Sequence, residues 1–150
     1  MPDQPSATVE CTTLIAAAPA AVFDFLRQAE EFPRYMPNVL SVRIIEQGNG
    51  RALTAWETLL DGAPLNWLEE DTYEPPHRLS YRLLEGDIEH LEGEWLIEEA
   101  EGGRARLTAR LAYRLGVPII EEVLGDIVRE KIRLNLEAML RATRRRLEGR

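Results

Sequence analysis

The segment IEEVLGDIVREKIRLNLEAMLRATRRRL, which runs from Ile120 to Leu147, decides the fold. Its apolar residues recur three and four positions apart, the spacing that places side chains on one face of an α-helix: Ile120, Leu124, Ile127, Val128, Ile132 and Met139. Because most of the remaining chain consists of strand-like segments, this helix can bury its apolar face only against a sheet. We therefore expect the stripe from Leu124 to Ile132 to pack across the concave face of a curved antiparallel sheet.

Seven segments ahead of this helix have the residue types and flanking turn residues of β-strands. We predict strands at residues 8–15, 39–47, 51–60, 64–74, 78–85, 88–99 and 104–115. Gly48-Asn49-Gly50 and Asp61-Gly62 have the composition of tight hairpin turns. A short helix over residues 20–27, preceded by Pro19, and a helical turn near residues 30–32 are predicted after the first strand. The predicted class is α+β: a seven-stranded curved antiparallel sheet around a long C-terminal helix.

The last two predicted strands show which face of the sheet is buried. Leu91 and Trp95 alternate with glutamates, and Leu111 and Tyr113 alternate mainly with arginines. Side chains alternate between the two faces of a strand, so Trp95 and Tyr113 are expected on the inner, apolar face. The acidic and basic residues are expected to form solvated cross-strand pairs on the outer face.

Composition and charge narrow the class of protein. The chain has 150 residues, of which 45% are hydrophobic and 29% charged, as is typical of one soluble domain spanning residues 1–150. A net charge of −8 argues against nucleic acid as a partner, because a phosphate-binding surface needs concentrated positive charge. No apolar run approaches the length of a transmembrane helix and no signal-peptide pattern is present, so we expect a soluble, cytoplasmic protein. The single cysteine, Cys11, excludes an intrachain disulfide.

Sequence motifs for metal binding, cofactor binding and nucleophilic catalysis are absent. His77 and His90 are the only histidines, and both are predicted at the surface. No paired His or Cys ligands indicate a zinc site, and no glycine-containing turn precedes a helix as a phosphate-binding loop would. We therefore predict no metal and no cofactor, and we assign no catalytic residue.

Two stretches, APAAVFDFLRQAEEFPRYMPNV from Ala18 to Val39 and EGDIEHLEGEW from Glu85 to Trp95, resemble the START-like (SRPBCC) superfamily. Within it, the chain is similar to the branch of polyketide cyclases/dehydrases and coenzyme-Q-binding proteins. The resemblance extends over nearly the whole chain and implies a helix-grip fold with two short helices after the first strand. It also implies cavity positions for Tyr35 and Asn135, since cyclases of this superfamily carry an aromatic residue and an asparagine in the corresponding regions.

The chain departs from the cyclase pattern after Trp67. Where that pattern has a small polar residue followed by an arginine, this chain has Glu69, Glu70 and Asp71. The arginine would be the cation that stabilises a developing enolate. Its replacement by acidic residues argues against polyketide cyclisation.

Glu69 and Asp71 lie on the same face of the predicted strand as Trp67, because alternate residues of a strand point to the same side. All three are therefore expected to face the cavity if Trp67 points inward. Burial without a paired cation raises the pKa of a carboxyl group, so we predict that Glu69 is a weaker acid than free glutamate. Alternatively, the strand twists near Pro75 and releases both carboxylates to solvent. Arg82 could lie opposite Glu69 or turn outward, depending on the strand register at that turn.

These features predict a protein that binds a hydrophobic or amphipathic small molecule, such as a lipid, an isoprenoid quinone or a polyketide-like aromatic. The candidate ligand-binding residues are Tyr35, Trp67, Glu69, Tyr81, Trp95, Tyr113 and Asn135. One alternative is an enzyme of the cyclase, dehydratase or isomerase type, with Glu69 or Asp71 as general base and Tyr35 or Asn135 as hydrogen-bond donor. Another is a protein-interaction module whose apolar groove receives a segment of a partner. The sequence does not indicate the oligomeric state.

Overall fold

The computed structural model describes residues 7–149. The described chain begins with β1 (Ala7–Ile15), α1 (Pro19–Arg27) and the 3₁₀-helix η1 (Ala29–Arg34). The remaining elements are β2 (Val39–Gly48), β3 (Arg51–Leu60), β4 (Ala63–Glu74), β5 (Arg78–Gly86), β6 (His90–Glu99), the short 3₁₀ turn η2 (Glu101–Gly103), β7 (Ala105–Arg114) and α2 (Pro118–Glu148). The predicted α+β helix-grip fold is confirmed, and each predicted element lies within two residues of its observed bounds.

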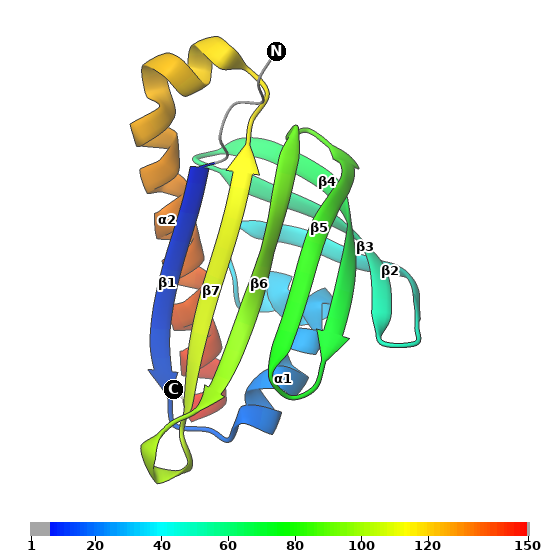
Figure 1. The fold of residues 1–150 in the computed structure, drawn as a ribbon, viewed down its shortest axis with the longest axis vertical. Coiled ribbons are helices and arrows are strands. Elements are labelled where there is room, and N and C mark those ends of the chain that lie inside the picture. The colour runs from blue at the N-terminus through cyan, green and yellow to red at the C-terminus, as the bar shows by residue number, and fades with distance from the viewer. Residues whose placement is uncertain (1–6, 150) are drawn as a thin grey trace.

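All seven strands form one antiparallel sheet in the order β1-β7-β6-β5-β4-β3-β2. β1 and β2 are therefore the edge strands, and β1 pairs with β7 from Ala7 opposite Tyr113 to Ile15 opposite Ala105. The sheet curves around α2, and α1 lies at one end of the space between them (Figure 1). The buried side chains of strands and helices form one apolar core in this space.

A tight turn at Asp61-Gly62 sets the register of the strands that form one wall of this interior. The two residues have φ angles of 52° and 82°. Two consecutive positive φ angles are typical of the type I′ hairpin turn, which the pair Asp-Gly favours. The turn joins β3 and β4 so that Trp56 lies directly opposite Trp67.

The helix α2 contacts the sheet nearer to its C-terminal end than the sequence predicts. Leu136 and Leu140 are buried, with 4% and 3% of their surface exposed, and Ile132 is half-buried. Leu124 and Ile127 are 44% and 55% exposed, so the prediction that they pack on the sheet is wrong.

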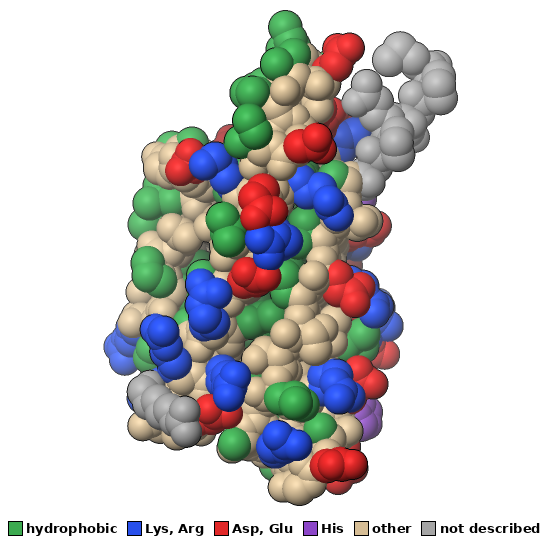
Figure 2. All heavy atoms as spheres, turned by 90° about the vertical axis from the view of Figure 1, so that its left-hand side faces the viewer, with side chains coloured by type: hydrophobic (Ala, Val, Ile, Leu, Met, Phe, Trp, Pro, Cys, Tyr) green, Lys and Arg blue, Asp and Glu red, His purple; other side chains and the backbone are tan. Residues whose placement is uncertain are grey.

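The first turns of α2 extend beyond the ends of β1 and β7, which explains this exposure (Figure 1). Figure 2 shows hydrophobic side chains on the surface of the projecting end. The spacing of apolar residues identifies the apolar face of a helix but not the point at which the sheet beneath it stops. Despite these apolar side chains, no helix within residues 7–149 is long and apolar enough to span a membrane.

The outer face of the sheet carries cross-strand ion pairs. Glu94 on β6 binds Arg78 on β5 at 2.7 Å and Arg110 on β7 at 3.1 Å. On the same face Arg82 binds Glu70 at 3.1 Å. Exposed pairs of this kind contribute about 1 kcal/mol or less each. Arg82 thus turns outward and supplies no positive charge to the interior.

Candidate ligand cavity

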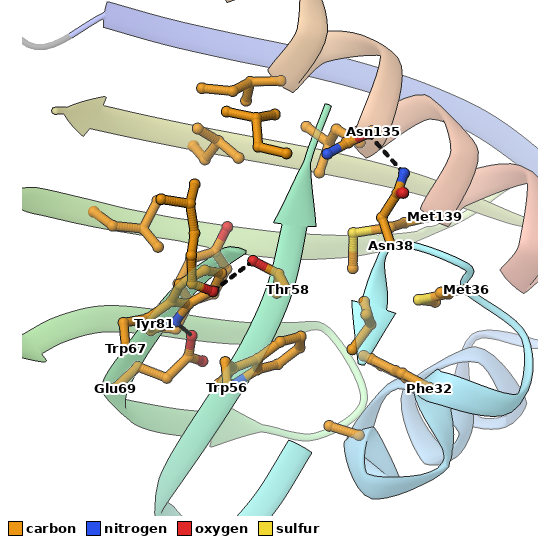
Figure 3. Close-up of a pocket in the computed structure, with 18 of the residues that line it drawn as sticks. Phe32, Met36, Asn38, Trp56, Thr58, Trp67, Glu69, Tyr81, Asn135 and Met139 are labelled. Carbon is orange, nitrogen blue, oxygen red and sulfur yellow. Dashed lines mark hydrogen bonds between the residues drawn. The ribbon is translucent and has the colours of Figure 1, made fainter. Parts of the chain in front are cut away.

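A cavity of about 170 Å³ lies between the concave face of the sheet and the helices η1 and α2 (Figure 3). Its wall is mostly apolar and includes Phe32, Met36, Trp56, Leu111 and Met139. For comparison, an engineered core cavity of about 150 Å³ binds benzene. The space is therefore large enough to admit a small organic molecule.

Glu69 and Asp71 on β4 line this cavity, with 3% and 9% of their surface exposed. The pairing of β3 with β4 is continuous through this stretch, so Trp67, Glu69 and Asp71 stay on the same face of the strand. A register shift after Leu68 affects only the pairing of β4 with β5. The strand therefore does not release the two carboxyl groups to solvent, and the alternative orientation is wrong.

Hydrogen bonds connect the two carboxyl groups to each other and to neighbouring side chains. The Trp67 indole Nε1–H donates to Glu69 Oε1 over 2.7 Å. The Thr54 hydroxyl on β3 donates to Asp71 Oδ2 over 2.7 Å and accepts from Trp56 Nε1 over 3.1 Å. A further hydrogen bond joins Glu69 to Asp71. Because two carboxylates have no proton to donate, this bond requires that one of them be protonated.

Burial raises the pKa of both carboxyl groups. The pKa of Glu69 is raised well above its usual value by burial, by the hydrogen bond to Asp71 and by the charge of Asp71. Burial also raises the pKa of Asp71, but the hydrogen bonds from Glu69 and Thr54 act in the opposite direction. Because both pKa values are raised, the pair retains a proton more readily than two free carboxyl groups would.

Glu69→Gln is expected to stabilise the protein at neutral and mildly alkaline pH. The glutamine amide can donate to Asp71 while its carbonyl accepts from Trp67, so the hydrogen bonds are retained. A carboxyl group whose pKa rises on folding stabilises the folded state. This contribution is fully present below the unfolded pKa of about 4.3, and it is lost as the pH rises through the folded pKa. The advantage of the variant over wild type should therefore grow from about pH 4 upward, by no more than about 1.4 kcal/mol per pH unit. Urea denaturation of both proteins at a series of pH values measures this difference in the free energy of unfolding.

Glu70→Gln is the matched control, because Glu70 neighbours Glu69 but pairs with Arg82 on the outer face. Its effect on the free energy of unfolding should stay within about 1 kcal/mol, as for other exposed ion pairs. If the difference in the free energy of unfolding between wild type and Glu69→Gln does not change with pH, the raised pKa of Glu69 is contradicted.

Trp56 and Thr54 belong to this arrangement although neither was among the predicted ligand-binding residues. The rings of Trp56 and Trp67 stack with their centroids 5.8 Å apart and their planes 7° apart. Both positions follow from the register that the Asp61-Gly62 turn sets between β3 and β4. This register places Trp56 opposite Trp67 and Thr54 opposite Glu69. Hairpin register is thus the sequence signal that identifies them.

Three other predicted residues, Tyr81, Trp95 and Tyr113, line the cavity. Tyr81 on β5 lies opposite Asp71 on one side and Gly93 on the other, and the missing side chain of Gly93 makes room for the tyrosine. Burial, followed by the charges of the nearby carboxyl groups, raises the pKa of the Tyr81 hydroxyl. This hydroxyl therefore remains protonated and can donate a hydrogen bond into the cavity.

Asn135 on α2 also lines the cavity, but its amide already makes two hydrogen bonds. Its Oδ1 accepts from Asn38 Nδ2 over 2.8 Å, and its Nδ2 donates to the Leu59 carbonyl oxygen over 3.3 Å. Figure 3 shows Asn38 and Asn135 facing each other among the residues that line the cavity. The pair ties α2 to the end of β3 and to the residue before β2.

The structure places Tyr35 between helices rather than in the cavity wall. Its ring packs against Phe25 with the centroids 5.7 Å apart, and the Arg146 guanidinium lies 5.0 Å from its centroid. Tyr35 therefore packs between α1 and the last turns of α2.

Comparisons with known proteins agree with this architecture. Among solved structures, TTHA0849 from Thermus thermophilus is 26% identical, with a TM-score of 0.89 over 95% of this chain and 98% of that one. The Zhui aromatase/cyclase from Streptomyces sp. R1128 is 23% identical, with a TM-score of 0.81 over 95% and 94% of the two chains. A START superfamily protein from Mycobacterium smegmatis is 20% identical, with a TM-score of 0.82 over 95% and 97%. The last two similarities show a shared fold.

Sequence comparison gives the family. No curated protein sequence matches the chain significantly. A family model, described as polyketide cyclase / dehydrase and lipid transport, matches residues 15–140 and thus most of the chain. The chain therefore belongs to the polyketide cyclase / dehydrase and lipid transport family.

Proposed function

We propose that this protein binds a small amphipathic molecule in the cavity between the sheet and α2. The observation that carries the proposal is the composition of the cavity wall. It is mostly apolar, and among the described residues that line it the only charged types are the two acids Glu69 and Asp71. The description of the family, which places lipid transport beside cyclase activity, supports the same proposal.

Apolar burial would supply most of the affinity. Removing apolar surface from water contributes about 25 cal/mol per Å², so a ligand that buries about 250 Å² gains roughly 6 kcal/mol before the cost of association. The polar groups of Glu69, Asp71 and Tyr81 would then orient the ligand. We expect affinities in the micromolar to millimolar range for small apolar probes.

The charges of the cavity favour binding over polyketide cyclisation. Cyclisation of a polyketide chain passes through an enolate, which a catalyst stabilises with a cation or with preorganised hydrogen-bond donors. None of the described residues lining the cavity is Arg, Lys or His. A negative charge that developed beside Asp71 would be repelled, so the site is poorly suited to this reaction.

Ala138→Phe is expected to weaken ligand binding by at least about tenfold, or 1.4 kcal/mol. Ala138 lies on α2 in the cavity wall, and the added phenyl ring would occupy much of the 170 Å³. A suitable probe is cyclohexylmethanol, which is apolar and transparent to ultraviolet light. All three tryptophans of the chain (Trp56, Trp67 and Trp95) line the cavity, so their fluorescence reports entry of the probe. Calorimetry gives the dissociation constant.

Ala21→Phe is the control, since Ala21 lies on the exposed face of α1. It should bind the probe as wild type does. The proposal fails if wild type binds no apolar probe, or if a folded Ala138→Phe variant binds as tightly as wild type. Native mass spectrometry of protein purified without detergent would identify a molecule bound in the cell.

A further inference from the structure

We infer that the molecule bound in this cavity carries an ammonium group, held by the carboxyl groups of Glu69 and Asp71. This inference rests on the proposed binding function and names the chemical class of the ligand.

The acidic pair meets no positive charge inside the cavity. Among the described residues that line it there is no Arg, Lys or His, and the nearby Arg82 points outward to Glu70. Thr54 and Trp67 give the carboxyl groups hydrogen bonds but no charge. A buried carboxylate is costly unless a cation compensates it. A ligand ammonium would supply that cation, whereas a ligand carboxylate or phosphate would be repelled.

Aromatic rings lie on both sides of the acidic pair. The stacked indoles of Trp56 and Trp67 adjoin Glu69 (Figure 3). Tyr81 lies opposite Asp71 on the neighbouring strand. The indole N–H edges of Trp67 and Trp56 point to Glu69 and Thr54, to which they donate hydrogen bonds. A ligand ammonium at the acidic pair would make charge-assisted hydrogen bonds, which favour an amine over a neutral molecule of the same shape.

Two other buried polar groups indicate a ligand independently of the acids. Trp95 and Tyr113 line the cavity and are only 8% and 4% exposed. Within residues 7–149, neither the Trp95 indole N–H nor the Tyr113 hydroxyl makes a hydrogen bond. No fully sealed side-chain nitrogen or oxygen in this range lacks a partner, so these two groups keep some accessible surface. Buried donors normally have partners, and here oxygen atoms on the body of the ligand would satisfy them.

The test compares three probes that share a cyclohexyl body: cyclohexylmethylamine, cyclohexylmethanol and cyclohexanecarboxylate. At about pH 7 they are a cation, a neutral molecule and an anion. Calorimetric titration into the full chain should show that the amine binds at least about tenfold more tightly than the alcohol, because charge-assisted hydrogen bonds are about twice as strong as neutral ones. The carboxylate should bind more weakly than both.

Two variants locate the ammonium group. The combined Glu69→Gln and Asp71→Asn variant removes both carboxyl groups while keeping their size, and should bind the amine no more tightly than the alcohol. Glu70→Gln, which removes a carboxylate from the outer face, should retain the preference for the amine. Equal binding of amine and alcohol by wild type, or a preference that survives in the double variant, would overturn the inference and leave the proposed binding function standing. If wild type binds none of the three probes, the inference and the proposed binding function are both contradicted.

Discussion

Leu136→Asp is expected to lower the free energy of unfolding by about 3–5 kcal/mol, a large fraction of the roughly 5–15 kcal/mol that stabilises an ordinary domain. Leu136 lies in the second half of α2, is 4% exposed and packs within the apolar core. The substitution removes apolar contacts and places a charge where water cannot reach it, and both changes destabilise the folded state. Urea denaturation followed by circular dichroism measures the loss.

Leu124→Asp makes the same change on the same helix and is the control. Because Leu124 is 44% exposed on the projecting end of α2, the substitution should change the free energy of unfolding by less than about 0.5 kcal/mol. An equally large loss in both variants would mean that α2 packs on the sheet along its whole length, contrary to the structure.

Gly93→Ala should lower the free energy of unfolding by about 2–3 kcal/mol, which corresponds to a fall of roughly 5–10 °C in melting temperature. A Cβ atom at this position would lie 2.5 Å from the Arg110 carbonyl oxygen and would also collide with the Tyr81 hydroxyl. The Arg110 oxygen belongs to the backbone of β7 and cannot move aside without disturbing the sheet. The new methyl group would therefore strain β6 and displace Tyr81 from the cavity wall.

Gly125→Ala provides the comparison for this substitution. Gly125 lies within α2, and a Cβ atom there would meet nothing within 4 Å. Alanine has the higher helix propensity, so this variant should be more stable than wild type by about 0.5–1 kcal/mol. Thermal melting of the two variants side by side distinguishes steric collision from a general effect of replacing glycine. Unchanged melting of Gly93→Ala would contradict the packing of Tyr81 over β6.

The strands could be predicted because local patterns determine them. Alternating residues in β6 and β7 identified the buried face, and the composition of the Asp61-Gly62 turn identified the hairpin between β3 and β4. Parity alone placed Glu69 and Asp71 on the same side as Trp67, and the structure buries both acids. Burial of an acid without a paired cation then raises its pKa.

Contacts between elements that are distant in sequence could not be predicted in this way. The direction of Tyr35 depends on Arg146, which the fold brings from the other end of the chain. The exposure of Leu124 depends on where β1 and β7 end, and spacing within a helix carries no information about that. The bond from Thr54 to Asp71 requires the register of two strands, and therefore the geometry of the turn between them.

The pairing of β1 with β7 also governs the order of events during synthesis. The ion pair between Glu10 and Arg110 joins residues 100 positions apart. A ribosome that adds about 5–20 residues per second leaves β1 without its partner strand for roughly 5–20 s. Until β7 emerges, the apolar side chains of Val9 and Ile15 and the backbone of β1 have no sheet to join. Because α2 is translated after β7, a nascent chain still lacking that helix cannot enclose a ligand.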